Sequence, residues 1–332
     1  MATGNHSDEV VRDIVRGMLK SGLVDEVLAF VEGLDESDIV PAFISDEQDV
    51  DRVSTAAYNP SSLAKLLSDF ADKDKRIGVV VRSCDARGII ELAKRHQVNL
   101  DNIHMVGLDC HGVTKPGAVR EGDQPLSDEM LNPACRRCEY PVPTMADMVC
   151  YVGGSRAAIK VYTGKGEKMA SAAGIPPGDV EVDISEAKER ARRWQEKDFG
   201  ELKAMSREER LKYWFSQFDK CIKCYGCRSS CPICYCEDCY LGADRVLIKR
   251  GEFPPEKLFH LTRLIHVADS CLNCGQCEAA CPMHIPISKL YHMLNKELSA
   301  VFAYDAGLDV TSMPPLGSIT ERDKEMGGVE FG

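Results

Sequence analysis

The sequence lacks the features of membrane, exported and nucleic-acid-binding proteins. It has no apolar stretch of 18 or more residues, so we expect no membrane span. Its first residues are polar and acidic instead of basic and then apolar, which argues against a signal peptide. The net charge of −11 leaves no excess of basic residues for phosphate contacts, so nucleic acid is not an expected partner. Together these absences predict a cytoplasmic protein.

Cysteine, in contrast, is abundant, with 16 residues in a chain of 332. A disulfide framework would suit a small secreted domain, but this chain is long and shows no export signal. In a reducing compartment thiolates serve metals or catalysis, and their spacing decides between the two. The chain is also longer than a typical single domain, so we expect two folded units and a connector.

The first half of the chain has the pattern of an α/β domain. Short buried strands are predicted at 77–81 and 103–108, with a helix over 86–96 between them. A strand, a helix and a strand over about thirty residues form a βαβ unit, which requires parallel strands in the sheet. Cys84 and Cys110 follow directly after these strands, at the edge where ligands of parallel sheets bind.

Two complete four-cysteine runs occupy the C-terminal third. Each has the spacing C-x2-C-x2-C-x3-C-P, in which three cysteines bind one 4Fe–4S cluster and the fourth ordinarily binds the other. The first predicted cluster therefore takes Cys221, Cys224, Cys227 and Cys281. The second takes Cys271, Cys274, Cys277 and Cys231. Zinc is a weaker alternative, because zinc sites favour pairs of C-x2-C.

Helical periodicity accompanies these runs. One amphipathic helix is expected between them, on the apolar residues Leu258, Leu261, Ile265 and Ala268. Another is expected after them, on Ile287, Leu290, Tyr291, Leu294 and Leu298. We therefore expect an all-helical, ferredoxin-like domain that holds two clusters. The spacing leaves open whether three further cysteines bind another metal or are free thiols beside a cluster: Cys234, Cys236 and Cys239.

The first half contains five more cysteines, namely Cys84, Cys110, Cys135, Cys138 and Cys150. Any four of them would complete a third 4Fe–4S site, and we expect Cys135, Cys138 and Cys150 to bind it together with either Cys84 or Cys110. A lone buried cysteine is usually a small hydrophobe, but a C-x2-C pair with cysteines at two strand ends favours the cluster. A tetrahedral zinc site is the local alternative.

A catalytic constellation is not evident among the remaining residues. The histidines form no cluster, and no nucleophile lies in a recognisable pattern with a base, so no catalytic residue is predicted. His111 follows Cys110 and either tunes a cofactor there or faces solvent.

Several segments resemble the beta subunits of coenzyme F420-dependent formate dehydrogenase and of F420-reducing hydrogenase, the former more closely. In the first half these are Ser83-Cys84-Asp85-Ala86 and Cys135-Arg-Arg-Cys138, with Ala146-Asp147 and Cys150. In the second half they are Cys221-Ile-Lys-Cys-Tyr-Gly-Cys227, Cys231-Pro-Ile-Cys-Tyr-Cys236 and Asp269-Ser-Cys-Leu-Asn-Cys-Gly-Gln-Cys-Glu278. The likeness covers most of residues 10 to 300.

The resemblance implies an α/β domain with a flavin and its own 4Fe–4S cluster, which passes electrons between FAD and the ferredoxin-like domain. In family members the flavin reduces the deazaflavin F420 by hydride transfer, and it joins two-electron chemistry to one-electron carriers. FAD would bind at the strand edge, where a helix N-terminus favours phosphate. The expected cofactor-binding residues there are Arg82, Ser83, Asp85, Arg87, His111 and Gly112. The two arginines would bind the diphosphate or, alternatively, neutralise the negative charge of a cluster.

Two functions remain open. The chain is either a flavin-containing beta subunit of an anaerobic oxidoreductase complex or a flavin-free module that only conducts electrons. Whether it is itself an enzyme stays undecided. Its partners would be catalytic or electron-accepting subunits of the formate dehydrogenase, hydrogenase or heterodisulfide reductase type. The expected domains are a flavin and cluster domain, a linker with a helical connector, a two-cluster domain and a tail, at residues 1–165, 166–215, 216–300 and 301–332.

Overall fold

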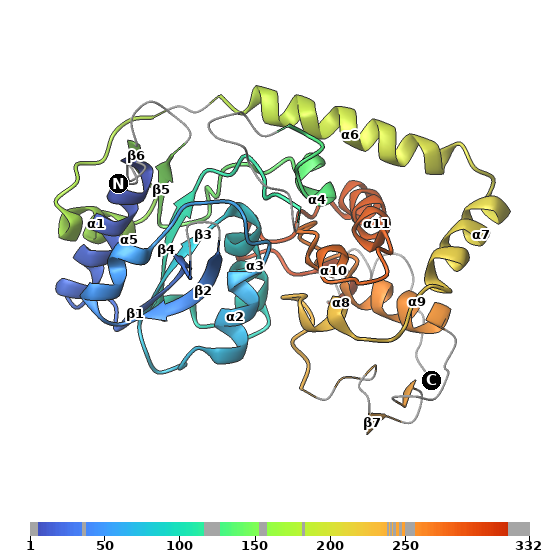
Figure 1. Cartoon of the computed structure of the whole chain (residues 1–332), viewed down its shortest axis with the longest axis horizontal. Helices are drawn as coiled ribbons and strands as arrows, with labels where there is room; N and C mark the ends of the chain where they lie inside the picture. Colours follow the sequence, from blue (N-terminus) through green and yellow to red (C-terminus); the bar gives the residue numbers. More distant parts are fainter. Residues whose placement is uncertain are drawn as a thin grey trace.

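The computed structural model of the chain is drawn in Figure 1. It describes residues 6–34, 38–115, 127–152, 158–180, 183–237, 239, 241, 244–245, 248–249 and 256–317. Among these residues no helix is both long enough and apolar enough to cross a membrane.

A six-stranded mixed sheet forms the centre of the N-terminal half (Figure 1). Its strands are β1 (Glu26–Glu32), β2 (Ile39–Ile44), β3 (Ile77–Val81), β4 (Ile103–Leu108), β5 (Met148–Tyr151) and β6 (Ala158–Val161). They lie in the order β2-β1-β3-β4-β5-β6, with β1, β3, β4 and β5 parallel and with β2 and β6 antiparallel at the edges. The predicted parallel strands are confirmed, and β3 and β4 begin and end at the expected residues.

Helices cover both faces of this sheet. On one face lie α1 (His6–Lys20) and α5 (Gly164–Ala173), whose apolar residues join those of alternate strand positions in one core. On the other face α2 (Leu63–Phe70) and α3 (Ser83–Lys94) pack on the intervening strand positions. Gly17 allows α1 and α5 to approach closely, since a Cβ atom there would lie 2.7 Å from the carbonyl oxygen of Ala172. The domain boundary expected at residue 165 therefore falls inside a helix that packs on the sheet.

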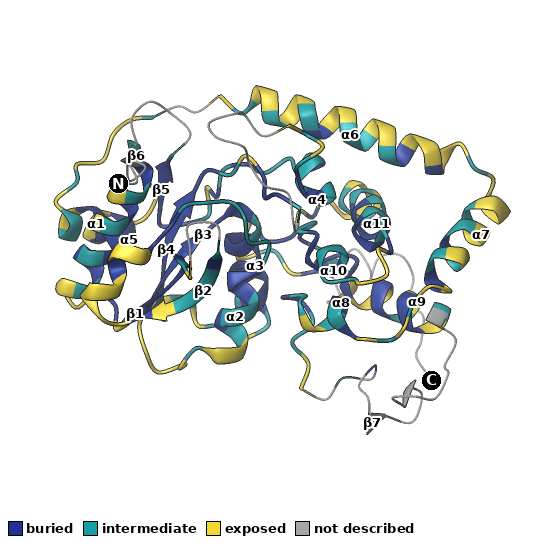
Figure 2. Cartoon of the chain, viewed as in Figure 1, coloured by how far each residue is buried: buried dark blue, intermediate teal, exposed yellow. Residues whose placement is uncertain are grey.

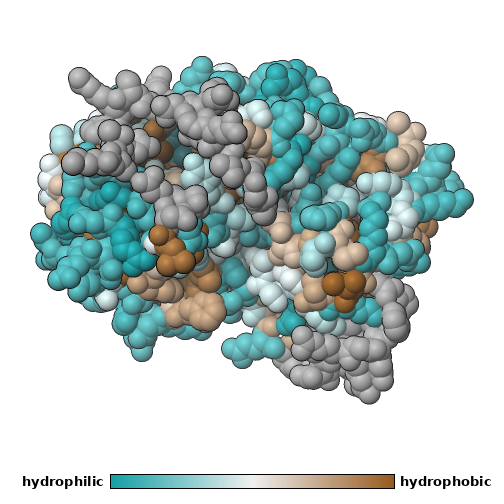
Figure 3. All heavy atoms as spheres, viewed as in Figure 1, coloured by the Kyte–Doolittle hydropathy of each residue, from teal (hydrophilic) through white to brown (hydrophobic). Residues whose placement is uncertain are grey.

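Two helices connect the halves, α6 (Ser185–Lys203) and α7 (Arg207–Phe218), and the predicted helical connector is thus present. They arch over one side of the molecule, and their outward residues are exposed and largely hydrophilic (Figures 2 and 3). Trp214 and Phe218 are buried in the C-terminal core. The Trp194 indole donates a hydrogen bond to Asp128 at 2.7 Å, so α6 is fastened to the N-terminal half.

The C-terminal half contains α8 (Gly226–Ser229), α9 (Glu256–Val267), α10 (Gln276–Ala279) and α11 (Ile287–Phe302) around a separate core. The expectation of an all-helical domain is not confirmed. An antiparallel pair of two-residue strands, β7 (Asp244–Arg245) and β8 (Ile248–Lys249), lies between the two cysteine runs.

Both predicted helices of this half are present, but the expected buried face of α9 is wrong. Leu258, Leu261 and Ile265 are exposed by 44%, 38% and 67%, whereas Phe259 and Val267 are buried. Of the four expected residues only Ala268, which directly follows the helix, is buried. The wrong face was expected because large apolar residues also recur at helical spacing on the solvent side of α9. In α11 the expected residues Ile287, Leu290 and Tyr291 are buried.

A buried polar network ties α3 to the segment that follows α11. The carboxylate of Glu91 is wholly buried and accepts hydrogen bonds from Lys94 at 2.8 Å, the Tyr304 hydroxyl at 2.6 Å and the Gly307 amide at 2.8 Å. Burial raises the pKa of Glu91, but hydrogen bonds from Lys94, Tyr304 and Arg95 outweigh it, so this pKa lies below its ordinary value. Residues 304–307, in the expected tail, are therefore part of the packed structure.

Candidate iron–sulfur sites

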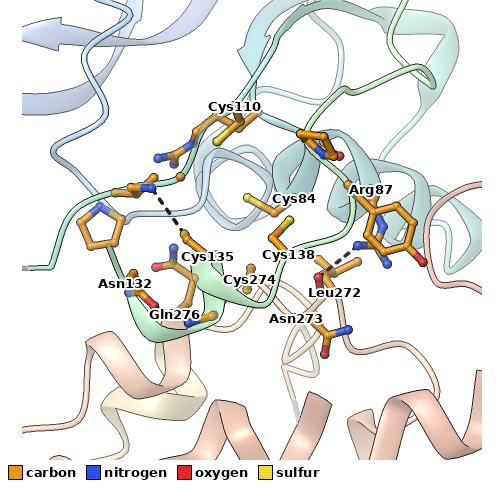
Figure 4. A pocket seen from close by; sticks show the side chains of 18 of the residues that line it. Cys84, Arg87, Cys110, Asn132, Cys135, Cys138, Leu272, Asn273, Cys274 and Gln276 are labelled. Carbon is orange, nitrogen blue, oxygen red and sulfur yellow. Dashed lines mark hydrogen bonds between the residues drawn. The ribbon is translucent and has the colours of Figure 1, made fainter. Parts of the chain in front are cut away.

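Four of the mid-chain cysteines meet at the carboxyl edge of the sheet. Cys84 is in the first turn of α3, Cys110 follows β4, and Cys135 and Cys138 lie in and after α4 (Pro133–Arg136). All four line one cavity, here called cavity A, and Figure 4 shows their sulfur atoms directed toward a common space. Adjacent parallel strands bring Cys84 and Cys110 together, as the strand-end argument predicted.

The backbone of residues 112–113 passes close to Cys135, at Gly112, and donates a hydrogen bond to its sulfur, at Val113. Gly112 lines the cavity with φ +110°, and a Cβ atom there would lie 3.2 Å from Cys135 Cβ. The Val113 amide donates to the Cys135 sulfur at 3.4 Å, as amides around cluster thiolates do. The hydroxyl of Ser83, which is buried on the same cavity wall, has no hydrogen-bond partner among the described residues.

Burial raises the pKa of all four thiols, and that of Cys135 reaches about 12. Cysteine binds metal as the thiolate, and four buried thiolates without a neighbouring positive charge would be energetically unfavourable. A metal centre bound here would supply the missing positive charge. The guanidinium of Arg82 opposes the effect of burial on Cys84 and Cys110.

Three arginines surround cavity A, and two of them were expected to bind a flavin diphosphate. The buried Arg82 donates to Asp85 at 3.3 Å and to the carbonyl oxygens of Asn59 and Ser61 at 2.8 and 2.6 Å. Asp85 in turn accepts from the Leu63 amide at 2.9 Å. Arg82 and Asp85 thus join α3 to the start of α2, and both side chains already have hydrogen-bond partners within the protein.

Arg87 is likewise occupied. Its side chain is buried, donates to the carbonyl oxygens of Ala306 at 2.7 Å and Leu272 at 3.2 Å, and stacks on the Tyr140 ring at 4.0 Å. Arg190, on α6, also lines the cavity, and it could not be recognised from the sequence because its segment is rich in Glu, Lys and Arg. These contacts favour the second expected role of the arginines, charge compensation beside a cluster.

The other expected residues of this edge lie apart from cavity A. Cys150 is fully buried within β5, on the sheet face that packs against α1 and α5, and does not line the cavity. The His111 side chain is 67% exposed and contacts Asp109 at 3.3 Å, which raises the pKa of His111. We expected Cys150 to join Cys135, Cys138 and only one of Cys84 and Cys110, but both of these strand-end cysteines line cavity A and Cys150 does not, nor does His111.

The eight cysteines of the two runs line two further cavities. Cavity B is lined by Cys231, Cys271, Cys274 and Cys277, and cavity C by Cys221, Cys224, Cys227 and Cys281. Each set combines three cysteines of one run with the last of the other, which is the exchange that the spacing predicted. The exchange is possible because the short helices α8 and α10, which follow equivalent loops, pack against each other.

Arg263 is the one cation on the wall of cavity B among the described residues. Its side chain is 1% exposed and donates to the Cys227 carbonyl at 2.8 Å and to the Tyr291 hydroxyl at 2.9 Å, while its Nε has no described partner. A buried cation such as Arg263 needs negative charge nearby. Cys227 and Cys231, which belong to different cysteine sets, would supply it as thiolates. Arg263 therefore lies where both C-terminal sets would feel its charge.

Cys274 lines cavity A as well as cavity B, so the two cavities adjoin. Figure 4 places Cys274 below the four sulfurs of cavity A, beside Leu272, Asn273 and Gln276 from the same loop. The order of the cavities in space is thus A, B and C, because B and C are joined by the exchanged cysteines.

The remaining cysteines lie beside cavity B. Cys234, Cys236 and Cys239 line a separate cavity with Arg263, and a hydrogen bond with Cys234 lowers the pKa of Cys231. Within the described residues, no three His, Cys, Asp or Glu side chains are placed to hold a single metal ion. The cysteines of the three sets instead line cavities A, B and C.

Known proteins match this chain along most of its length. A family model described as a 4Fe-4S dicluster domain matches residues 217–285, which include both cysteine runs. The F420-dependent formate dehydrogenase subunit beta of Methanocaldococcus jannaschii is 32% identical over 363 aligned residues, covering 93% of this chain and 94% of the relative. The chain belongs to the family of F420-dependent formate dehydrogenase beta subunits. The resemblance noted in the sequence is therefore confirmed.

A second relative and a solved structure also match the chain. The F420-dependent formate dehydrogenase 1 subunit beta of Methanococcus maripaludis is 30% identical, covering 92% of each chain. A xenon-derivatised structure of the F420-reducing [NiFe] hydrogenase complex from Methanosarcina barkeri covers 60% of this chain and 89% of its own. It does so at a TM-score of 0.47 and 16% identity.

Proposed function

We propose that this beta subunit conducts electrons through three 4Fe–4S clusters, between a two-electron redox site and a partner subunit of an oxidoreductase complex. The observation that carries the proposal is the position of Cys274, which lines both cavity A and cavity B. Three cysteine sets in contact form a continuous path through the chain, whereas separate structural zinc sites would need no such contact. Each cluster would supply a one-electron carrier.

The proposed ligands follow the three cavities. Cavity A would use Cys84, Cys110, Cys135 and Cys138, with Cys150 as a structural cysteine. Cavities B and C would use the sets that line them. Arg82, Arg87, Arg190 and Arg263 are proposed to offset the negative charge of the clusters, since a cluster with four thiolates is anionic.

FAD has less support at the expected place. Cavity A has a volume of about 40 Å³ and is lined by thiols, whereas cofactor pockets usually hold 300–1,000 Å³. The arginines expected to hold a diphosphate are bound within the protein. The described residues of cavity A thus fit a cluster and do not fit a flavin, and we derive no flavin step there.

A larger cavity, of about 600 Å³, opens at the other end of the sheet, beside Ile77 and Ile103. These residues begin β3 and β4, so the five-residue strand β3 separates this cavity from Cys84 by about 17 Å. Such a separation is unfavourable for a flavin that must exchange electrons with cavity A. The electron-conducting function without FAD at the cysteine edge is therefore our first proposal.

A second function is favoured by the family. The relatives are named for F420, and a chain that covers over nine-tenths of them is a candidate for the same use. F420 oxidation would require a hydride acceptor such as FAD, held outside cavity A. The complex would then couple F420 to a formate dehydrogenase catalytic subunit, and partners of the hydrogenase or heterodisulfide reductase type remain alternatives.

The domain division is also a proposal. We assign residues 1–165 to the α/β cluster domain, 166–215 to the connector, 216–300 to the two-cluster domain and 301–332 to the tail. The packing of α5 on α1 favours extending the first domain through Ala173.

Anaerobic purification followed by cofactor extraction tests the function. The first proposal predicts the broad visible absorption of iron–sulfur clusters and iron in proportion to three clusters, with no stoichiometric flavin. One FAD per chain, together with F420 reduction by the purified complex, would establish the second function instead. Zinc in place of iron would refute both.

A further inference from the structure

The two cysteine runs form equivalent loops. In the first run Lys223 and Tyr225 have φ of 54° and 60°, and in the second run Asn273 and Gly275 have φ of 57° and 75°. Each loop leads into a four-residue helix, α8 or α10. Ile222 in the first loop therefore corresponds to Leu272 in the second, and Cys224 corresponds to Cys274.

The second loop is covered by the N-terminal domain. Leu272 is 4% exposed, and its carbonyl accepts a hydrogen bond from Arg87. Cys274 reaches into the wall of cavity A. This is how one cysteine set meets the next within the chain: an apolar residue is buried, and the neighbouring cysteine is brought to the adjoining cavity.

The first loop has the same backbone and the same kind of residues, but it faces solvent. Ile222 is 61% exposed, Cys224 is exposed, and both line cavity C. Pro282 and Met283, which follow the last cysteine of the second run, line the same cavity and are also exposed. An apolar surface beside a cysteine of an expected cluster is what a protein partner would cover.

We propose that Ile222, Cys224, Pro282 and Met283 form a docking surface for a protein subunit that carries its own iron–sulfur cluster. The partner would cover the first loop as the N-terminal domain covers the second, so that the chain of cavities A, B and C continues into the partner. The inference rests on the proposed function, because it requires an electron carrier in cavity C. It adds that the path leaves the chain at cavity C and that the partner contacts the surface formed by these four residues.

We infer a cluster-bearing protein as the partner because the equivalent second loop, at Leu272 and Cys274, meets another cysteine cavity and not a lipid or a small ligand. The α9 residues Leu258, Leu261 and Ile265 form a different exposed apolar surface, but they line neither cavity B nor cavity C. They provide a matched control. Ile265 is 67% exposed, close to the 61% of Ile222, and belongs to the same domain.

The test uses the tagged full chain, isolated anaerobically from its source organism with the subunits that accompany it. Wild type and Ile265→Glu should both retain a subunit that contains iron and acid-labile sulfide and is identified by mass spectrometry. Ile222→Glu and Met283→Glu should each reduce the recovery of that subunit at least tenfold. Iron is also measured on the tagged chain of every variant, because loss of the partner from a chain with full iron is thereby distinguished from loss of the cluster in cavity C.

A photo-reactive amino acid at position 222 should cross-link to the same subunit, and one at position 265 should not. Retention of the subunit by both Ile222→Glu and Met283→Glu, cross-linking only from position 265, or a partner without iron would overturn the docking surface. A wild-type chain without iron would refute the proposed function instead, so the two failures are distinguishable.

Discussion

Replacement of Arg263 by methionine should lower the reduction potentials of both C-terminal clusters. The side chain is 1% exposed, lines cavity B, and donates to the carbonyl of Cys227, which lines cavity C. Reduction adds a negative charge to a cluster, and a buried fixed cation stabilises that charge. Methionine is unbranched and adaptable in packing, so the substitution mainly removes the charge.

The expected size follows from Coulomb's law. A unit charge roughly 8 Å from a cluster, at an effective dielectric constant of about 20, contributes about 2 kcal/mol. For a one-electron couple this corresponds to roughly 85 mV. Cavity B should show the larger shift, because Arg263 lines that cavity and reaches cavity C only through the Cys227 backbone.

An EPR-monitored redox titration of the anaerobic holoprotein measures these potentials directly. Arg263→Lys should retain more than half of the stabilisation, because it keeps the charge but loses the planar donor geometry. Arg228→Met, on the same domain but outside cavities B and C, should shift the potentials little. Unchanged potentials in Arg263→Met at full iron content would refute the reasoning, and loss of iron in both Arg263 variants would show a purely structural role.

Three further substitutions test other parts of the structure. Cys138→Ser should remove about four irons per chain and leave the EPR signals of the C-terminal clusters intact, whereas Cys150→Ala should retain all iron. Glu91→Gln should lower the stability of the holoprotein by about 3 kcal/mol, seen as a lower Tm, because it leaves the Lys94 ammonium buried without its carboxylate. The pKa of Glu91 is lower in the folded state than its ordinary value, so its contribution to stability is present above about pH 4.5 and is lost at lower pH. The Tm difference between wild type and Glu91→Gln should therefore narrow as the pH falls below about 4.5.

The cysteine sets could be predicted from the sequence because their geometry is local. A C-x2-C-x2-C run fixes three sulfurs within one loop, and two adjacent parallel strands fix Cys84 and Cys110 at one edge. Cys150 was expected as a ligand in place of one of Cys84 and Cys110, because spacing alone could not separate the five candidates. Its position in β5 decides the matter, because alternation along the strand directs its side chain to the opposite sheet face.

The roles of the arginines depended on contacts that no local pattern contains. Arg87 binds Leu272 and Ala306, which are 185 and 219 residues away in the chain. Arg263 lies in α9, where the apolar residues that are in fact exposed led us to expect the wrong buried face. Both arginines are therefore recognised only once the N-terminal domain, the cysteine loops and the final segment are assembled.

The central claim is that this beta subunit holds three clusters along one path. Iron and acid-labile sulfide, measured on the full-length chain after anaerobic purification and combined with Mössbauer spectroscopy, test it most directly. The account predicts about twelve irons per chain, all in 4Fe–4S clusters. A content of about eight irons, with cavity A occupied by zinc or by nothing after careful reconstitution, would contradict it.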